Sequence, residues 1–375
     1  MAVNLQRQTI APEEKKESLG EKINNLFLRF SRVPLKEKLF FVQHLGIMLK
    51  AGISLAVSLK TLARQTANKK FVKILEKMGG DIERGVGFAE SLKPHKEIFG
   101  ELFVNMVKAG EISGKLESVL AQLYIQLKKQ HELISKVKGA LTYPLVILFA
   151  MGGIGIFMMV FVLPKITDML KEFNAELPLP TKILIAVSGF LIKNGILSAL
   201  IFVAVIFVAV KILRTYKGKY YFQMILLKTP IVAPIVKKIN LARFARTISS
   251  LLKTDIMIIK TFQITGNVLG NLHYRNALFQ MAEKIKQGGQ INEVVKGYPK
   301  LFPPVVTQMI VVGEQTGELD NILEELAEFY EGEVDQIMNN LPAIIEPLLI
   351  LFLGVGVGAM AVAIIMPMYS LTSSV

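Results

Sequence analysis

The heptapeptide GEISGKL at residues 110–116 returns as GEQTGEL at residues 313–319, a separation of 203 residues. The same shift aligns pairs of identical residues on both sides of it: Phe41 with Phe244, Met78 with Met281, Phe99 with Phe302, Pro144 with Pro347, and Pro164 with Pro367. No gap is needed across about 125 residues. Chance similarity would not hold one register through both polar and apolar stretches, so the sequence predicts a duplicated unit.

Charge-free runs indicate where each copy enters a membrane. Residues 139–164 are 26 residues without a charge, and as a helix they would be about 39 Å long, against a hydrocarbon core of about 30 Å. A second run covers residues 194–210 and is extended on its N-terminal side if Lys193 snorkels to the interface. A third begins at Pro347. We expect three transmembrane helices, at residues 139–164, 183–213 and 343–368.

The composition agrees with a chain that is part soluble and part membrane. Hydrophobic residues make up 52% and charged residues 20%, whereas soluble domains average roughly 45–50% and about 25%. The chain has no Cys, which excludes disulfide scaffolds, thiolate nucleophiles and Cys-ligated metal sites. Its net charge of +14 suits an anionic partner, either nucleic acid or the phosphate face of a membrane.

The distribution of Lys and Arg predicts the orientation. Residues 1–138 carry 24 of them and the tail after Glu346 carries none, so both large polar regions are expected on the cytoplasmic side. The unmatched middle span returns the chain to that side, which makes this a parallel repeat rather than an inverted one. The predicted soluble segments are a polar extension at 1–36, cytoplasmic helical domains at 37–138 and 240–341, an outer loop at 165–182 and an outer tail at 369–375.

Each soluble domain reads as a helical bundle. Residues 37–50, 54–67, 69–84 and 100–110 have apolar side chains at three- and four-residue spacings and are separated by glycines. No Pro or Gly interrupts residues 115–138, so one long helix is expected to run towards the first span. The predicted fold class is an all-α polytopic membrane protein with two homologous bundles and three spans.

The repeated heptapeptide has the composition of a helix–turn–helix junction. Its residues of interest are Gly110, Glu111, Ser113, Gly114, Gly313, Glu314, Thr316 and Gly317. Gly110 and its counterpart are expected to take positive φ and end one helix, Ser113 and its counterpart to cap the next, and Glu111 and its counterpart to accept from N–H groups of that turn. The motif lacks the Gly-Lys-Ser/Thr ending of a phosphate loop. A partner-binding or metal role for the glutamates is the alternative.

Two further sets of residues lie at the predicted spans. Gly153, Gly155, Gly354, Gly356 and Gly358 are expected to serve close helix packing rather than dinucleotide binding, because they lie inside apolar runs. The predicted membrane-entry motif comprises Tyr143, Pro144, Glu346 and Pro347. Glu346 is interpreted as an interfacial carboxylate, with a functional intramembrane acid as the alternative.

Charges along the two long helices are complementary. The second copy carries an acidic run between Glu324 and Asp335. The first copy carries basic residues on its own long helix, namely Lys115, Lys128, Lys129, Lys136 and Lys138. A solvated face is the simpler interpretation. Pairing of the two copies through opposite charge is the alternative.

Several motifs together resemble a known family. They are FVQHLGIMLKAGISL (41–55), VKAGEISGKL (107–116), KGALTYPLVI (138–147), LFPPVVTQMIVVGEQTGEL (301–319) and PAIIEPLLILFLG (342–354). In this order, with a duplication and three spans, they resemble the type II secretion F-protein family over residues 40–372. Thr254-Asp255 replaces the usual Ala-Gly turn in the second copy, so equivalent turn geometry is open there.

The resemblance implies a non-enzymatic platform in the bacterial inner membrane, with a cytoplasmic N-terminus and a periplasmic C-terminus. It implies coupling of a cytoplasmic hexameric assembly ATPase to insertion of pilin or pseudopilin subunits, contacts with other inner-membrane assembly proteins and membrane lipid, and homo-oligomerisation. The residues themselves predict no catalytic site, cofactor or metal, because the chain has no Cys, its four His are scattered and the repeated motif lacks a phosphate-loop ending. No nucleic acid partner is predicted, because retention of positive charge on the inner leaflet accounts for the net charge. A type IV pilus is favoured over a type II secretion or DNA-uptake pseudopilus, and a transporter or channel subunit is the alternative of another class.

Overall fold

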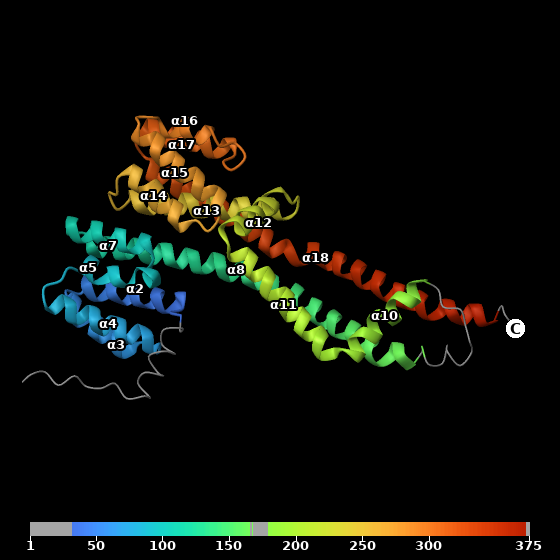
Figure 1. Ribbon diagram of the computed structural model, residues 1–375. Coiled ribbons are helices and arrows are strands. Elements are labelled where there is room, and N and C mark those ends of the chain that lie inside the picture. Colours follow the sequence, from blue (N-terminus) through green and yellow to red (C-terminus); the bar gives the residue numbers. More distant parts are fainter. Residues whose placement is uncertain (1–31, 166, 168–178, 373–375) are drawn as a thin grey trace, which may run out of the picture. The chain divides into compact units, whose positions relative to one another are not determined.

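The computed structural model describes residues 32–165, 167 and 179–372 (Figure 1). Over these residues the secondary structure is helical, without a strand, and three helices are long and apolar enough to cross a membrane. The expected all-α fold with three candidate spans is confirmed. Most of the predicted extension 1–36, most of the outer loop 165–182 and the end of the predicted tail 369–375 lie outside the described residues.

The chain separates into two compact units, residues 1–124 and residues 125–375, and the boundary falls inside helix α8. The described part of the first unit is a bundle of short helices. They are α2 (Leu35–Lys50), α3 (Leu55–Gln65), α4 (Lys69–Glu83), α5 (Phe88–Leu92), the 3-10 helix η1 (Lys93–His95), α6 (Lys96–Phe99), α7 (Glu101–Ser113) and the first turns of α8 (Leu116–Phe157). Apolar residues of α2 and α7 at helical spacing form its core, among them Phe41, Leu45 and Phe103.

The second unit contains the rest of α8, a second bundle and the remaining spans. In chain order its elements are the π-helical η2 (Met158–Val162), α10 (Leu179–Lys193), α11 (Gly195–Arg214), α12 (Tyr216–Lys228), α13 (Val232–Leu252), α14 (Ile258–Val268), α15 (Leu272–Lys286), α16 (Ile291–Lys296), α17 (Pro304–Thr316) and α18 (Leu319–Thr372). In Figure 1, α13 to α17 gather around the first part of α18.

The two bundles repeat one another helix by helix. Helices α14, α15 and α17 have the same lengths as α3, α4 and α7 and begin 203 residues later, as does α18 relative to α8. The side chain of Asn68 caps α4 by accepting from Phe71 N at 3.1 Å, and Asn271 caps α15 by accepting from His273 N at 2.9 Å. The duplication read from the sequence is therefore a duplication of structure.

The cores repeat as well. Three aromatic rings occupy equivalent positions in each bundle, namely Phe41, Phe71 and Phe99 in the first and Phe244, Tyr274 and Phe302 in the second. Within each set the ring centroids recorded in contact lie between 4.9 and 5.8 Å apart, the separation at which aromatic pairs attract one another. Each copy therefore builds its own hydrophobic core around the same aromatic contact.

The turn at Thr254-Asp255 keeps the geometry of the first copy despite its different residues. Gly52 has a φ of 78°, and Asp255 at the equivalent position has a φ of 57°. Among the described residues, Asp255 is the one non-glycine residue with positive φ. Asp tolerates this left-handed conformation better than most side chains do, so the two turns are equivalent.

Helices α8 and α18 connect bundle and membrane without a break. Helix α8 covers 42 residues and continues through Pro144, and α18 covers 54 residues. The long helix expected from residue 115 onward is confirmed and extends into the span. A helix of 54 residues is about 80 Å long, far more than a bilayer needs, so one continuous helix is long enough to reach from the second bundle through a bilayer.

The second span differs from the expectation of one helix over residues 183–213. Helix α10 ends at Lys193, Asn194 has non-helical angles (φ −124°, ψ 42°), and α11 begins at Gly195. Asn and Gly are poor helix formers and favour turns, which explains the break. Helix α11 alone, with 20 residues, is the candidate span, and at about 30 Å it is long enough. Lys193 therefore does not lie within a continuous second span.

Candidate functional site

The repeated heptapeptide forms the turn between two helices in each bundle, but its glycines have exchanged roles relative to the prediction. Gly114 and Gly317 take the left-handed conformation that ends α7 and α17, with φ of 69° and 77°. Gly110 and Gly313 are helical residues inside α7 and α17. The expectation of positive φ at the first glycine of each motif is wrong, because the helix continues for one more turn before it ends.

Gly110 and Gly313 are instead places of close helix approach. A methyl group on Gly110 would lie 2.7 Å from Val119 Cγ2 and 3.2 Å from Leu116 Cα, and one on Gly313 would lie 2.9 Å from Leu319 Cα. Contacts this short require the backbones to move apart. The absence of a side chain therefore sets how closely the long helix packs against the one before it.

Alanine at Gly110 is expected to destabilise the first bundle by about 1–3 kcal/mol, because it overpacks the crossing with α8. The matched control is Gly80→Ala in helix α4, where a methyl group would meet no atom within 4 Å. That substitution is expected to stabilise by about 0.5–1 kcal/mol through helix propensity. Amide hydrogen exchange of α7 and α4 in the full chain measures both changes in stability. If both substitutions changed stability in the same direction, the close-approach role of Gly110 would be contradicted.

The glutamate of each motif caps a different helix from the one expected. Glu111 accepts hydrogen bonds from the backbone N–H groups of Phe88 and Ala89, at 2.5 and 2.9 Å. These groups belong to the first residues of α5, more than 20 residues before the glutamate. The predicted acceptance within the motif's own turn is therefore wrong. The carboxylate ties the end of α7 to the start of α5, where the helix dipole favours negative charge.

The second copy repeats this contact. Glu314 accepts from Ile291 N at 2.9 Å and from Asn292 N at 3.2 Å, at the start of α16, and it also accepts from Asn292 Nδ2 at 2.7 Å. The same carboxylate–helix contact at the same separation in both units indicates a structural role. Among the described residues, no group of three or more His, Asp or Glu side chains is placed to hold a metal ion.

The predicted capping of the following helix is limited to Thr316, whose Oγ1 accepts from Glu318 N, directly before α18, at 3.4 Å. Ser113 Oγ donates back to Gly110 O at 3.5 Å, and Thr316 Oγ1 donates back to Val312 O at 2.9 Å. Both hydroxyls therefore lie on the helix that is ending, because the turn falls after them. Glu117 and Asp320 do lie in the first turns of α8 and α18, as expected for acidic residues near a helix N-terminus.

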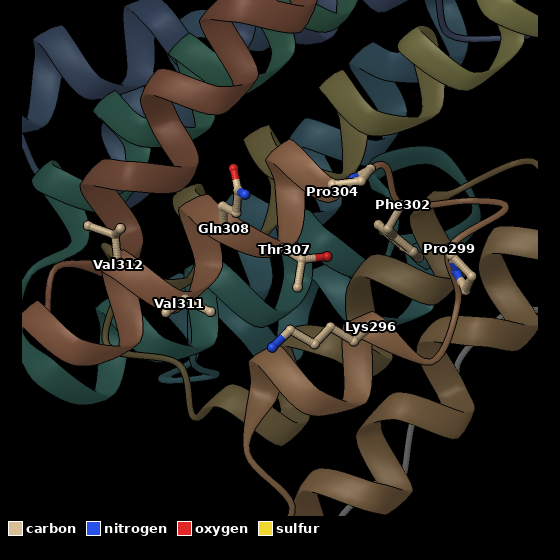
Figure 2. Close-up of a pocket in the computed structure, with 8 residues that line it drawn as sticks. All are labelled: Lys296, Pro299, Phe302, Pro304, Thr307, Gln308, Val311 and Val312. Atoms are coloured by element: carbon tan, nitrogen blue, oxygen red, sulfur yellow. The ribbon is translucent and has the colours of Figure 1, made fainter.

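An apolar cavity lies between α17 and α16, the helix whose first residues donate to Glu314. Its volume is about 520 Å³, and the eight residues labelled in Figure 2 line it. Lys296, the last residue of α16, forms one wall, and Thr307 and Val311 of α17 form another. Because Glu314 holds the start of α16, its carboxylate also helps to position the wall that carries Lys296.

A buried arginine joins α13 to α18. The side chain of Arg246 is 4% exposed and forms a bidentate pair with Glu331, with both N–O distances 2.9 Å, while Glu324 accepts at 3.2 Å. Burial by itself lowers the pKa of Arg246. The hydrogen bond and charge of Glu331, together with the charges of Glu324 and Glu328, outweigh this effect, so the pKa of Arg246 is raised above its usual value. No pattern in the sequence singles out Arg246, because the equivalent residue of the first copy is Gln43.

Helix α8 enters the same network beyond residue 125. Lys129 Nζ lies 3.2 Å from Glu331, and Lys136 pairs with Asp335. Gln126 accepts from Ser250 Oγ at 3.0 Å, which links α8 to α13. Part of the acidic run of the second copy thus pairs with lysines of the first, as the alternative interpretation held. We call this junction of α8, α13 and α18 the stalk.

The stalk continues as an apolar cluster towards the spans. Leu133 of α8 packs with Val334, Met338 and Leu341 of α18. Ile235 and Ile239 of α13 and Ala140 and Ile345, at the beginning of the spans, pack against this cluster. Charged pairs thus lie on the bundle side of the stalk and apolar contacts on the membrane side, which is the order that increasing distance from water requires.

The remaining predicted site residues lie on the spans. Tyr143 is exposed and Pro144 is buried on α8, while Glu346 and Pro347 are exposed on α18. A methyl group on Gly153, Gly155, Gly354, Gly356 or Gly358 would meet no atom within 4 Å among the described residues. A packing role for these glycines, and a function for Glu346, stay predictions about contacts outside this chain.

Both copies match one known family. Residues 41–164 and residues 244–367 each match the type II secretion system (T2SS) protein F family. These two matches cover more than half of the chain, and their bounds differ by the 203 residues of the internal repeat. The chain belongs to this family. In this T2SS protein F family member, the family unit comprises the repeated bundle, the capped turn and one membrane span.

Individual relatives agree with this assignment. The type IV pilus assembly protein PilC of Thermus thermophilus is 37% identical over 337 residues, which is 90% of this chain and 83% of the relative. The PilC of Myxococcus xanthus is 33% identical over 92% of this chain and 83% of its own length. The type II secretion system protein F of Aeromonas hydrophila is 27% identical over 99% of this chain and 96% of its own length.

Proposed function

We propose that this protein is the inner-membrane platform of a type IV pilus assembly machine, which couples a cytoplasmic assembly ATPase to insertion of pilin subunits into the fibre. The observation that carries the proposal is the repeated family unit, in which each bundle continues into a span through one helix. The greater identity to the pilus assembly proteins of Thermus and Myxococcus than to the Aeromonas secretion protein supports a pilus. A type II secretion or DNA-uptake pseudopilus is the second candidate.

The stalk supports a mechanical role. A helix stiffened by neighbours on two sides transmits displacement, whereas a loop would absorb it. Arg246 and the cluster around Leu133 hold α8, α13 and α18 together up to the point where two of them enter the spans. In this proposal the chain hydrolyses no ATP itself, works as a homo-oligomer and contacts other inner-membrane assembly proteins.

Deletion of the gene is expected to abolish surface fibres, counted by electron microscopy, and the wild-type gene is expected to restore them. Secretion of folded proteins and uptake of DNA, measured in the same strains, distinguish the three candidate machines. Fibres that persist at wild-type number in the deletion strain would overturn the pilus assignment. Loss of secretion alone would assign the chain to a type II secretion machine.

The proposed topology places residues 37–138 and 240–341 in the cytoplasm. Because the chain has no Cys, single cysteines report on it directly. In whole cells, a membrane-impermeant thiol reagent is expected to label Lys165→Cys, at the outer end of the first span, but neither Glu90→Cys nor Gln290→Cys. All three positions are exposed in the structure. Labelling at Gln290→Cys but not at Glu90→Cys would show that the repeat is inverted rather than parallel.

A further inference from the structure

Helix α12 exposes a large apolar face. It links span α11 to the second bundle, and its side chains Tyr221, Phe222 and Ile225 are 62%, 44% and 62% exposed. At 100° per residue these three positions fall on one side of the helix. A contiguous aromatic and aliphatic face of this kind is uncommon on a surface that meets water.

The opposite face of α12 is held by the second bundle. Gln223 Oε1 accepts from Leu272 N at 2.7 Å, and Gln223 Nε2 donates to Gly270 O at 3.1 Å. The rings of Tyr220 and His273 lie 4.2 Å apart, and Tyr216 OH accepts from Asn276 Nδ2. These contacts fix the rotation of α12, so the apolar face points away from the bundle.

Both ends of α12 lie close to membrane-spanning segments. Its N-cap, Thr215, follows directly after Arg214, the last residue of span α11. At the other end the chain passes the exposed Ile231 and enters α13, whose Ile235 and Ile239 pack against the cluster that includes Ile345 at the start of the third span. Helix α12 therefore joins the end of one candidate span to a helix that packs beside the start of another.

The charge of this segment suits an anionic surface. Residues 211–238 contain seven Lys and Arg and no Asp or Glu. On the helical wheel Lys217 and Lys219 fall on opposite flanks of the apolar face, where their chains can reach headgroups on either side of it. A basic cluster immediately outside a span, joined to an amphipathic helix, is the pattern that binds anionic lipid.

We propose that α12 is an in-plane membrane anchor. It binds anionic phospholipid of the leaflet that lies at the C-terminal end of span α11, where α12 begins. Tyr221, Phe222 and Ile225 enter the region between headgroups and acyl chains, and Arg214, Lys217 and Lys219 bind lipid phosphates. Because Gln223 and Tyr220 tie α12 to the second bundle, lipid binding would fix that bundle at a set height above the membrane. The proposal goes beyond fibre assembly and does not depend on it.

The first test measures depth. The chain has no Trp, so Tyr221→Trp in the full chain, reconstituted into vesicles, is a unique fluorescent reporter. Brominated phospholipids are expected to quench it, with its emission shifted to shorter wavelength. The matched control is Phe329→Trp on the bundle part of α18, a position that is 54% exposed and is expected to remain unquenched. A water-like emission and no quenching at position 221 would overturn the proposal.

The second test measures lipid selectivity. A minor fraction of brominated phosphatidylglycerol in phosphatidylcholine vesicles is expected to quench Tyr221→Trp several-fold more than the same fraction of brominated phosphatidylcholine in phosphatidylglycerol vesicles. Replacing Arg214, Lys217 and Lys219 by Gln is expected to bring this quenching ratio close to one, because the basic side chains that attract the anionic lipid are removed. The control, which replaces the exposed bundle residues Lys260, Lys286 and Lys300 by Gln, is expected to leave it unchanged.

Equal quenching by the two brominated lipids in the parent chain would overturn the anionic site. So would an equal loss of selectivity in both triple variants. Neither result bears on the pilus assignment, which rests on fibre counts in the deletion strain.

Discussion

Replacing Arg246 by Gln is expected to destabilise the second bundle by about 3–5 kcal/mol, because it leaves the half-buried carboxylates of Glu324 and Glu331 without the buried cation that they share. Glu331 would lose a bidentate partner at 2.9 Å, and Glu324 would lose its contact with Arg246 at 3.2 Å. Lys129 and Lys253 would remain beside these carboxylates, which sets the expected loss towards the lower end of that range. The effect should concentrate in α13 and in the bundle part of α18.

Amide hydrogen exchange in the full chain, reconstituted in lipid, measures this loss locally. A global melting temperature would serve less well, because chains with two units seldom unfold in one step. The control is Arg275→Gln, whose side chain contacts Asn267 and the face of Phe279 at the exposed surface. This change is expected to cost less than about 1 kcal/mol.

The double variant Arg246→Gln with Glu331→Gln provides a further check. Because the partners act as one unit, the combined loss is expected to be smaller than the sum of the two single losses. Strict additivity would show that Arg246 and Glu331 do not interact in solution. A loss in α13 no greater than that of Arg275→Gln would contradict the role of the buried arginine.

Features that repeat or that depend on composition could be predicted from the sequence. The register of 203 residues is set by matching residues at one fixed offset. The helices running into the spans and the three charge-free segments arise from local patterns of polarity. The pairing of Lys129 and Lys136 with the acidic run is one of the two interpretations that the sequence allows, because opposite charges lie on two helices of equivalent position.

Features that depend on contacts between distant residues could not be predicted in the same way. The heptapeptide was recognised as a turn, but its glutamate caps a helix that begins more than 20 residues earlier, and no local pattern identifies that partner. Gly110 and Gly114 are both glycines near a helix end, and only the path of α8 shows which one needs positive φ. The break at Asn194-Gly195, by contrast, had a readable signal in two adjacent residues of low helix propensity.

Alanine at Glu111 and at Glu314 is expected to destabilise the first and second bundle by about 2–4 kcal/mol each, because each change leaves two backbone N–H groups at a helix start without their charged acceptor. Phe88 and Ala89, which donate to Glu111, are buried, so water replaces the carboxylate poorly there. Hydrogen exchange is expected to accelerate in α5 for the first variant and in α16 for the second. Gln at either position, which keeps one neutral acceptor, is expected to lose less.

The control is Glu90→Ala, which removes a carboxylate that pairs with Lys93 on the surface and is 56% exposed. That change is expected to cost less than about 1 kcal/mol. The comparison also separates the two interpretations of the motif. If the glutamates served to bind a metal or a partner, their removal would leave the isolated chain as stable as Glu90→Ala does. A large loss in both bundles would instead show that the family's repeated acid holds each copy of the unit together before any partner arrives.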